Sequence, residues 1–185
     1  MTLNSAKDIH LIFHAVHKQL RVHGGAGEFH WSTEARGEGD FADQKRNNGN
    51  TPVGRYWCGE PVPIPALDRD GKKFGPWFIP LQPEKGVATG RSGLGIHGGG
   101  SDLSSPRAEF QGWETTHGCI RLQNFDVERL AKSLAYTTRT GGAALLTVDW
   151  TLGPWAPGTL GYMSAVPRVT PKQVNAASGK KTPSR

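Results

Sequence analysis

Two histidines and a cysteine lie close together near the middle of the chain. His97 opens a glycine-rich stretch, and after the loop 101–115 the run His117-Gly118-Cys119 follows. A cysteine is a good nucleophile at neutral pH only when a base, a positive neighbour or a helix N-terminus favours its thiolate. The histidines could supply that help, and Gly118 would let the main chain approach a substrate carbonyl, as an oxyanion hole of backbone N–H donors requires. These residue types make Cys119 a candidate nucleophile.

The same side chains have other readings. His97, His117 and Cys119 could instead ligate Zn²⁺, which commonly takes His and Cys ligands. Since no fourth ligand stands at a recognisable spacing, we predict no metal site and no cofactor. Cys58, between Trp57 and Gly59, is predicted to be a small buried apolar residue. Two cysteines do not make a disulfide framework, and we expect Cys119 to be a free thiol.

The residues around Cys119 strongly resemble the catalytic motif of the L,D-transpeptidases, the YkuD family. That motif is a histidine, a variable loop, then Ser/Thr-His-Gly-Cys, an apolar residue and Arg or Asn; here it reads His97 and then Thr116-His117-Gly118-Cys119-Ile120-Arg121. The resemblance extends to residues 51–56, which look like the family's Thr-Pro-x-Gly strand entry, and to residues 122–126, which look like its entry to a helix. It covers residues 9–148. The loop after His97 is slightly longer than is usual in the family, which bears on the shape of the substrate entrance.

The resemblance implies a set of catalytic roles. Cys119 would attack the carbonyl of the third residue of a peptidoglycan stem peptide, a diamino acid, and expel the terminal D-amino acid. An amine (cross-linking or amino-acid exchange) or water (L,D-carboxypeptidase activity) would then resolve the thioester. His97 matches the family's general base, oriented by the carbonyl of Gly98, and the backbone donors of His117, Gly118 and Cys119 match its oxyanion hole. Such an enzyme is expected to act in cell shape and to be a carbapenem target.

Candidate substrate-binding residues surround this motif. Arg121 could hold a substrate carboxylate, because a guanidinium pairs well with carboxylates, or it could pair with Asp126 or Glu128 instead. Trp113 and Trp77 could line the groove, although core packing is an equal alternative for Trp77. The residues assigned to substrate binding are Arg121, Thr116, Trp113 and Trp77.

The elements that position these residues are mostly short strands. Apolar runs between turn signals predict strands within 9–22 (two strands joined by a turn near 17–19), 29–32, 51–57, 94–97 and 143–148. The polar segment 34–50 is predicted to be a loop, and Pro61, Pro63 and Pro65 an extended, strand-poor connection. The fold class expected is mainly β, with L,D-transpeptidase-like mixed β-sheets enclosing the site.

One prominent helix is predicted after the catalytic cysteine. Asn124 is a good N-cap residue, and acidic residues follow in the first turn. Apolar residues at i, i+3, i+4 and i+7 then give the helix one apolar face: Val127, Leu130, Ala131 and Leu134.

The chain has 185 residues, a length that fits one domain. We predict a catalytic domain over 1–150 and a C-terminal extension over 151–185, rich in Gly, Pro, Ser and Lys, with a disordered end. The net charge of +6 is dispersed and suits an acidic polymer such as peptidoglycan. We expect stem peptides as partners and no nucleic acid.

The location of the protein follows from its expected substrate. No stretch reaches the roughly 20 apolar residues of a membrane span, and no signal peptide is visible in residues 1–10. The resemblance nevertheless implies the periplasm or the cell wall. Two other functions stay open: a wall-binding module without catalysis, and a secreted or phage-borne toxin that damages the wall with the same chemistry.

Overall fold

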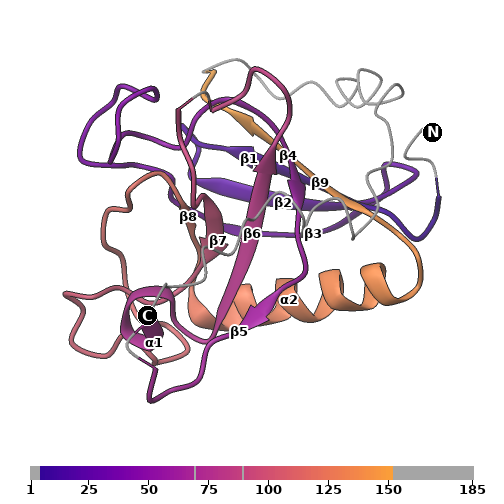
Figure 1. Cartoon of the computed structure of the whole chain (residues 1–185). Coiled ribbons are helices and arrows are strands. Elements are labelled where there is room, and N and C mark those ends of the chain that lie inside the picture. The colour runs from indigo at the N-terminus through magenta and orange to yellow at the C-terminus, as the bar shows by residue number, and fades with distance from the viewer. Residues whose placement is uncertain (1–4, 69, 89, 152–185) are drawn as a thin grey trace, which may run out of the picture.

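A computed structural model describes residues 5–68, 70–88 and 90–151. The predicted extension, residues 151–185, lies outside this range except for Thr151, and so does its predicted disordered end. The elements of the described part follow one another in this order: β1 (Ile9–His14), β2 (Gln19–Gly24), β3 (Phe29–Glu34), β4 (Gly54–Cys58), β5 (Val62–Pro63), α1 (Asp70–Phe74), β6 (Trp77–Pro83), β7 (Gly95–His97), β8 (Ile120–Arg121), α2 (Asn124–Arg139) and β9 (Ala144–Asp149) (Figure 1).

The strands form a mixed sheet in the order β3-β2-β1-β9-β4-β6-β7-β8, and β5 pairs with β6. The last strand, β9, lies between β1, to which it is parallel, and β4, to which it is antiparallel. At the other end of the sheet β7 and β8 are parallel, while β6 pairs with β4 and β7 in the antiparallel sense. The prediction of a mainly β fold with mixed pairing is confirmed.

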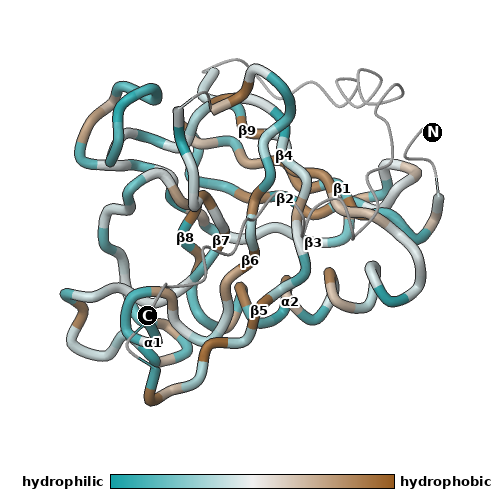
Figure 2. Tube along the Cα trace, viewed as in Figure 1, coloured by the Kyte–Doolittle hydropathy of each residue, from teal (hydrophilic) through white to brown (hydrophobic). Residues whose placement is uncertain are grey.

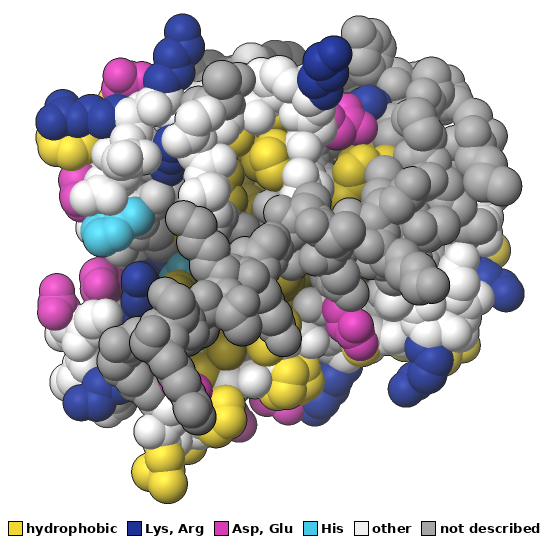
Figure 3. Space-filling model, viewed as in Figure 1, with side chains coloured by type: hydrophobic (Ala, Val, Ile, Leu, Met, Phe, Trp, Pro, Cys, Tyr) yellow, Lys and Arg dark blue, Asp and Glu magenta, His cyan; other side chains and the backbone are white. Residues whose placement is uncertain are grey.

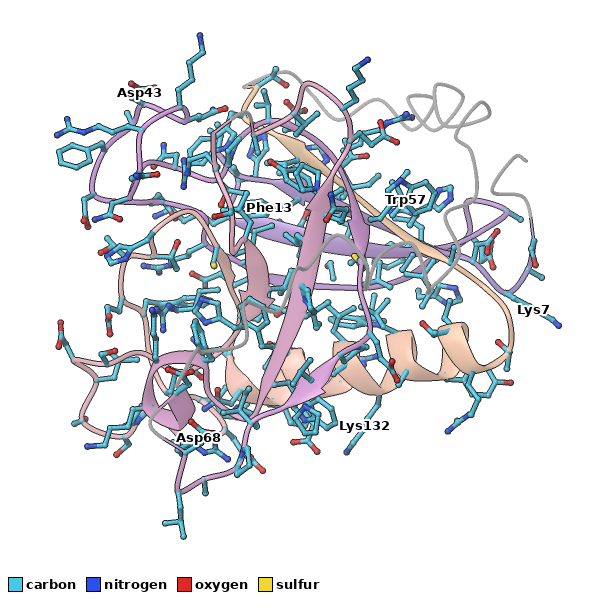
Figure 4. All side chains as sticks on the ribbon, viewed as in Figure 1. Lys7, Phe13, Asp43, Trp57, Asp68 and Lys132 are labelled. Carbon is cyan, nitrogen blue, oxygen red and sulfur yellow. The ribbon has the colours of Figure 1, made fainter. Side chains whose placement is uncertain are left out.

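The first two strands show why the sequence folds this way. Side chains alternate across a strand, and in β1 Leu11 and Phe13 are fully buried in the main core. The turn to β2 places Lys18 at a φ of 52°, and β2 continues the core with Leu20 and Val22. Figure 4 shows Phe13 inside the fold, whereas Lys7, Asp43 and Lys132 lie at its periphery. The two predicted strands and the turn between them are confirmed.

Helix α2 packs its predicted apolar face against this core. Val127, Leu130, Ala131 and Leu134 are buried, and in Figure 1 the helix runs along one side of the strands. Figure 2 shows the same division, with hydrophobic stretches in strands such as β1 and outlying loops that are mainly hydrophilic. The predicted helix and its buried face are confirmed.

The prediction that Asn124 caps α2 is wrong. The cap position is Gln123, whose side chain makes no capping bond, and Asn124 is the first helical residue. The Asn124 side chain forms hydrogen bonds with neighbouring loops instead. Its Oδ1 accepts the Gly99 N–H at 2.9 Å, and its Nδ2 donates to the carbonyls of Pro106 and Ala108. The segment 61–65 also holds the two-residue strand β5, and the short helix α1 follows it without having been predicted.

His10 is a buried titratable group on the face of β1 opposite Leu11 and Phe13. Its side chain is 3% exposed, and neither ring nitrogen has a hydrogen-bond partner in the described part of the chain. Burial lowers the pKa of His10 below its ordinary value, and the charge of Asp8 opposes this effect only in part. His10 is therefore neutral in the folded protein near neutral pH.

The substitution His10→Phe is expected to make the protein more resistant to acid. Because the folded-state pKa is lowered, the unfolded state binds more protons below about pH 6.5, so His10 removes stability as the pH falls. Phenylalanine removes this contribution, and without two unpartnered polar atoms it should also stabilise the fold by about 1 kcal/mol at pH 7.5. Thermal unfolding at pH 7.5 and pH 5 measures both effects. His30→Gln, at an exposed histidine, is the control. An equal loss of thermal stability between pH 7.5 and pH 5 in wild type and His10→Phe would contradict the expectation.

Candidate active site

The parallel pair β7–β8 brings the two halves of the motif together. Ile96 lies opposite Ile120, both fully buried, and His97 lies opposite Arg121. Because side chains alternate along a strand, His97 and Arg121 share the face opposite the two isoleucines, and Cys119 continues this alternation one residue before β8. Cys119 and His97 are thus diagonal neighbours on one face, a spacing that long side chains can bridge.

His97 is buried, with 3% of its surface exposed. Its Nδ1 lies 2.7 Å from the Gly98 carbonyl oxygen, which can only accept, so Nδ1 carries the proton and Nε2 is the basic nitrogen. The rings of Phe74 and Phe78 lie 5.0 and 6.1 Å from the imidazole. Burial, and then the charge of Arg121, lowers the pKa of His97 to about 3. The imidazole is therefore neutral at physiological pH.

The loop that follows His97 is held by backbone bonds to α1. Gly98 donates its N–H to the Phe74 carbonyl at 3.1 Å, and Gly100 donates to the Lys72 carbonyl at 2.8 Å. Gly99 has a φ of 59°, and a Cβ on Gly98 would collide with the Asn124 side chain. The glycines are thus required by close packing, and they keep the Gly98 carbonyl at the imidazole.

Cys119 is a free cysteine whose thiol lies 3.7 Å from the Gly93 carbonyl oxygen. Burial raises the pKa of its thiol, while the Gly95 backbone and the charges of Lys73, Arg121 and Arg91 act in the opposite direction. Cys58 is also free and is partly buried against the core, where burial raises its pKa to about 12. The two cysteines differ in that nearby positive charges oppose the effect of burial on the pKa of Cys119, whereas burial alone raises that of Cys58.

A tight turn leads into Cys119. The Thr116 hydroxyl donates to the Cys119 carbonyl at 2.7 Å and accepts the Gly118 N–H at 3.3 Å, and Thr51 donates to the same carbonyl at 3.2 Å. The Thr116 N–H bonds the Glu38 carbonyl at 3.0 Å. Thr116 was predicted to bind substrate, and the structure gives its hydroxyl internal partners in this turn. Thr51, from the predicted strand entry, supports it from the other side.

The side chain of His117 points out of the turn. It is 63% exposed, and its Nε2 lies 3.9 Å from Asp40 Oδ2. Its backbone faces inward, because the His117 carbonyl accepts a 2.8 Å bond from Arg91 Nη2. His97 and His117 therefore occupy different environments, the first enclosed and the second at the surface.

Arg121 is buried, with 3% exposed, and its terminal nitrogens bond main-chain carbonyls. Nη1 donates to Gly98 at 3.2 Å and to Gly99, and Nη2 donates to Thr115 at 3.5 Å. Within the described residues its Nε has no partner. The alternative pairing of Arg121 with Asp126 or Glu128 is wrong, because those carboxylates bond Thr33 and Lys132 respectively.

The two tryptophans lie in different places. The Trp113 ring is partly exposed and carries the Arg36 guanidinium 4.5 Å from its centroid. Trp77 begins β6, pairs with Pro63 and packs against the core.

Among the described residues no group of three or more His, Cys, Asp or Glu side chains is arranged to hold a metal ion. No helix in that part of the chain is long and apolar enough to cross a membrane.

Sequence reasoning missed several residues that surround the site. Phe74 and Lys73 come from α1, which carries no strong local signal, and Arg91 stands alone in a loop. The turn dipeptide Gly75-Pro76 after α1 was a signal for the end of that segment. The sequence offers no signal that would have identified Arg91 as a residue near the site.

The fold and this geometry can be compared with known proteins. The family model for the L,D-transpeptidase catalytic domain, YkuD, matches residues 16–149. This chain belongs to the L,D-transpeptidase (YkuD) family. The match includes the whole of the motif from His97 to Arg121. None of the curated protein sequences matches the chain.

Solved structures resemble this L,D-transpeptidase domain at low sequence identity. Bd1075 of Bdellovibrio bacteriovorus is 15% identical, with a TM-score of 0.54 over 80% of this chain and 51% of that one. An L,D-transpeptidase of Stackebrandtia nassauensis is 16% identical, with a TM-score of 0.50 over 80% and 58%. LdtMt1, solved in complex with imipenem, is 15% identical, with a TM-score of 0.42 over 76% and 58%. The domain thus spans little more than half the length of these chains.

Proposed function

We propose that this L,D-transpeptidase domain forms a thioester between Cys119 and a peptidoglycan tetrapeptide stem, and then transfers the acyl group to an amine or to water. The observation that carries the proposal is the β7–β8 register, which puts Cys119 and His97 on one face of a rigid strand pair. Nucleophile and base must be neighbours for this chemistry, and sites on strands hold their geometry well.

The protonation states suggest how the first step runs. His97 Nε2 takes the Sγ proton as the sulfur attacks the carbonyl carbon, and the carbonyl electron pair moves onto oxygen. The tetrahedral intermediate then collapses, the C–N bond breaks, and the leaving D-amino acid takes the proton from the imidazolium. Because the pKa of His97 is lowered and that of Cys119 is raised, an ion pair is not the resting state. Proton transfer is therefore concerted with attack.

In the second step the same residues act in reverse order. An acceptor amine, or water, gives its proton to His97 as it attacks the thioester carbon, and the C–S bond breaks to restore the thiol. The backbone amides of His117, Gly118 and Cys119 would hold the oxyanion in both steps. The 3.3 Å bond from the Gly118 N–H to Thr116 Oγ1 is long, which supports an amide whose hydrogen a substrate oxyanion, as a stronger acceptor, can take without rotation of the peptide.

We propose that two of the four residues predicted to bind substrate instead hold the main chain of the site in place. Thr116 bonds the turn of Cys119, and Arg121 bonds the carbonyls of the loop that orients His97, so both shape the site. Trp113 stays our candidate for contact with substrate because its ring is partly exposed. For Trp77, which packs against the core, we favour a structural role.

The expected substrate places the domain outside the cytoplasm, in the periplasm or the cell wall. Among the described residues visible in Figure 3, Lys and Arg side chains are scattered among Asp and Glu and form no continuous basic band. Such a surface suits local contacts with stem-peptide carboxylates better than tracking of a nucleic-acid backbone.

Intact-mass spectrometry of the purified protein tests the function. With a tetrapeptide stem we expect an adduct with the mass of the peptide minus its terminal D-amino acid, and free D-amino acid in solution. A carbapenem, whose strained ring presents an electrophilic carbonyl, should give a single adduct. Digestion should place both on Cys119, and the control Cys58→Ala should form both. A wall-binding module without catalysis would form no acyl-enzyme, and adducts on Cys58 would contradict the choice of nucleophile.

A further inference from the structure

Arg91 lies in the loop between β6 and β7, and its side chain is buried, with 8% exposed. Its guanidinium donates to three main-chain carbonyls: Gln44 at 2.7 Å, His117 at 2.8 Å and Gly49 at 3.4 Å. No carboxylate lies within salt-bridge distance of Arg91 in the described part of the chain. A buried charge is costly when no opposite charge offsets it, so this arrangement needs an explanation.

The bond to His117 fixes the direction of the next amide. A peptide group is planar and trans, so its C=O and N–H point in opposite directions. By holding the His117 carbonyl at 2.8 Å, Arg91 sets the plane of the His117–Gly118 peptide and turns the Gly118 N–H away from itself. This amide immediately precedes Cys119, where a substrate carbonyl oxygen would become negative.

Gly118 is packed directly against the guanidinium. Its φ is 106°, a region that favours glycine, and a Cβ built on it would collide with Arg91 Nη2. The glycine of the motif therefore has two structural causes, its backbone conformation and the presence of Arg91. The guanidinium leaves no room for a Cβ at Gly118, so its positive charge lies directly beside the turn.

We propose that Arg91 is a positioning residue for acyl transfer, orienting the Gly118 amide and keeping a positive charge beside the turn where the oxyanion forms. The inference rests on the proposed function. Arginine suits both tasks, because its planar fork reaches the 44–49 loop and the catalytic turn at once, whereas a lysine ammonium is a point charge without that fork. The missing carboxylate is explained as well, since a paired carboxylate would cancel the charge.

Arg107 is exposed, unlike Arg91, and it offers a control for the bonds that join loops. It too bonds main-chain carbonyls, those of Ile64 at 3.1 Å and Gly75 at 2.8 Å, and so joins loops without a carboxylate partner in the described structure. It makes no bond to the turn of Cys119. A residue that only joins loops should behave like Arg107.

The test compares Arg91→Lys, Arg91→Met and Arg107→Lys in two assays. Arg91→Lys keeps the charge and loses the fork, so kcat for acylation should fall about 10- to 100-fold with little change in KM. Its pH profile of Cys119 alkylation by iodoacetamide should stay near wild type. Arg91→Met loses both, so kcat should fall further and the alkylation profile should move to higher pH. Arg107→Lys should match wild type in both assays once thermal unfolding shows it to be folded.

Two results would overturn the inference. One is a folded Arg91→Lys variant with the wild-type kcat. The other is an equal fall in kcat in Arg91→Lys and Arg107→Lys that is proportional to the fall in their thermal stability. Alkylation needs no stem peptide, so this arm remains decisive if wild-type protein forms no thioester. If wild-type protein forms no thioester, the proposed function fails. The role of the Arg91 charge would be overturned by a different result, a pH profile of Cys119 alkylation that is unchanged in Arg91→Met.

Discussion

Cys119→Ala should abolish acyl transfer while the protein stays folded. Without sulfur no thioester can form, and loss of a covalent nucleophile is expected to lower kcat by about 10⁴-fold or more. The thiol makes weak polar contacts, one of 3.7 Å with the Gly93 carbonyl and one with the Gly95 backbone, so its removal should change the free energy of unfolding by about 1 kcal/mol. Release of D-amino acid from a tetrapeptide measures the activity, and thermal unfolding measures the stability.

Cys58→Ala is the matched control, because this cysteine is also free and lies in β4, against the core. It should keep most of the activity. Turnover at the wild-type rate in Cys119→Ala would show that the sulfur is not the nucleophile, and loss of activity in Cys58→Ala alone would reverse the assignment of the two cysteines.

Replacing His97 by alanine should give the second largest loss. A positioned general base contributes about 10²- to 10⁴-fold, so kcat should fall by that factor with little change in KM. The His117 side chain is exposed, and in the proposed mechanism His117 contributes its backbone N–H, so His117→Gln should lower kcat much less. Single-turnover acylation of both variants decides between them, and a larger loss in His117→Gln would exchange their roles.

The same histidine sets an expectation for pH. Because burial and Arg121 lower the pKa of His97 to about 3, the base is neutral at pH 5 and above. The wild-type acylation rate should therefore not fall through a histidine titration between pH 8 and pH 5.5. A histidine of ordinary pKa would lose about tenfold per pH unit below about 6.5. A rate that halves near pH 6.5 in folded protein would contradict the buried, neutral imidazole.

The parts of the fold that could be predicted depend on local pattern. The alternation in β1 and β2 and the i, i+3, i+4 spacing in α2 both follow from the geometry of a single element, so the sequence is enough. The run from Thr116 to Arg121 is equally local, so it is enough to predict Cys119 as the nucleophile.

Contacts between distant segments could not be predicted. Asn124 has the chemistry of a helix cap, but the loop after His97 offers its side chain better partners, and that loop is 25 residues away. Arg121 has acidic residues nearby in sequence, yet it turns to the carbonyls of Gly98 and Gly99 across the strand pair. Arg91 meets the turn of Cys119 only because the 44–49 loop and β7 lie beside it in space.

The place of β9 in the sheet has a consequence for how the protein is made. β1, β2 and β3 lie on one side of it and β4, β6, β7 and β8 on the other, so β9 joins the two parts of the sheet. It is also the last of these strands to be synthesised. During translation the N-terminal strands can pair early, but the sheet cannot close until residues 144–149 have emerged. Until β9 has emerged, the half of the sheet that carries Cys119 and His97 has an unpaired edge at β4. A chaperone or another chain can pair with this edge of β4 during that time.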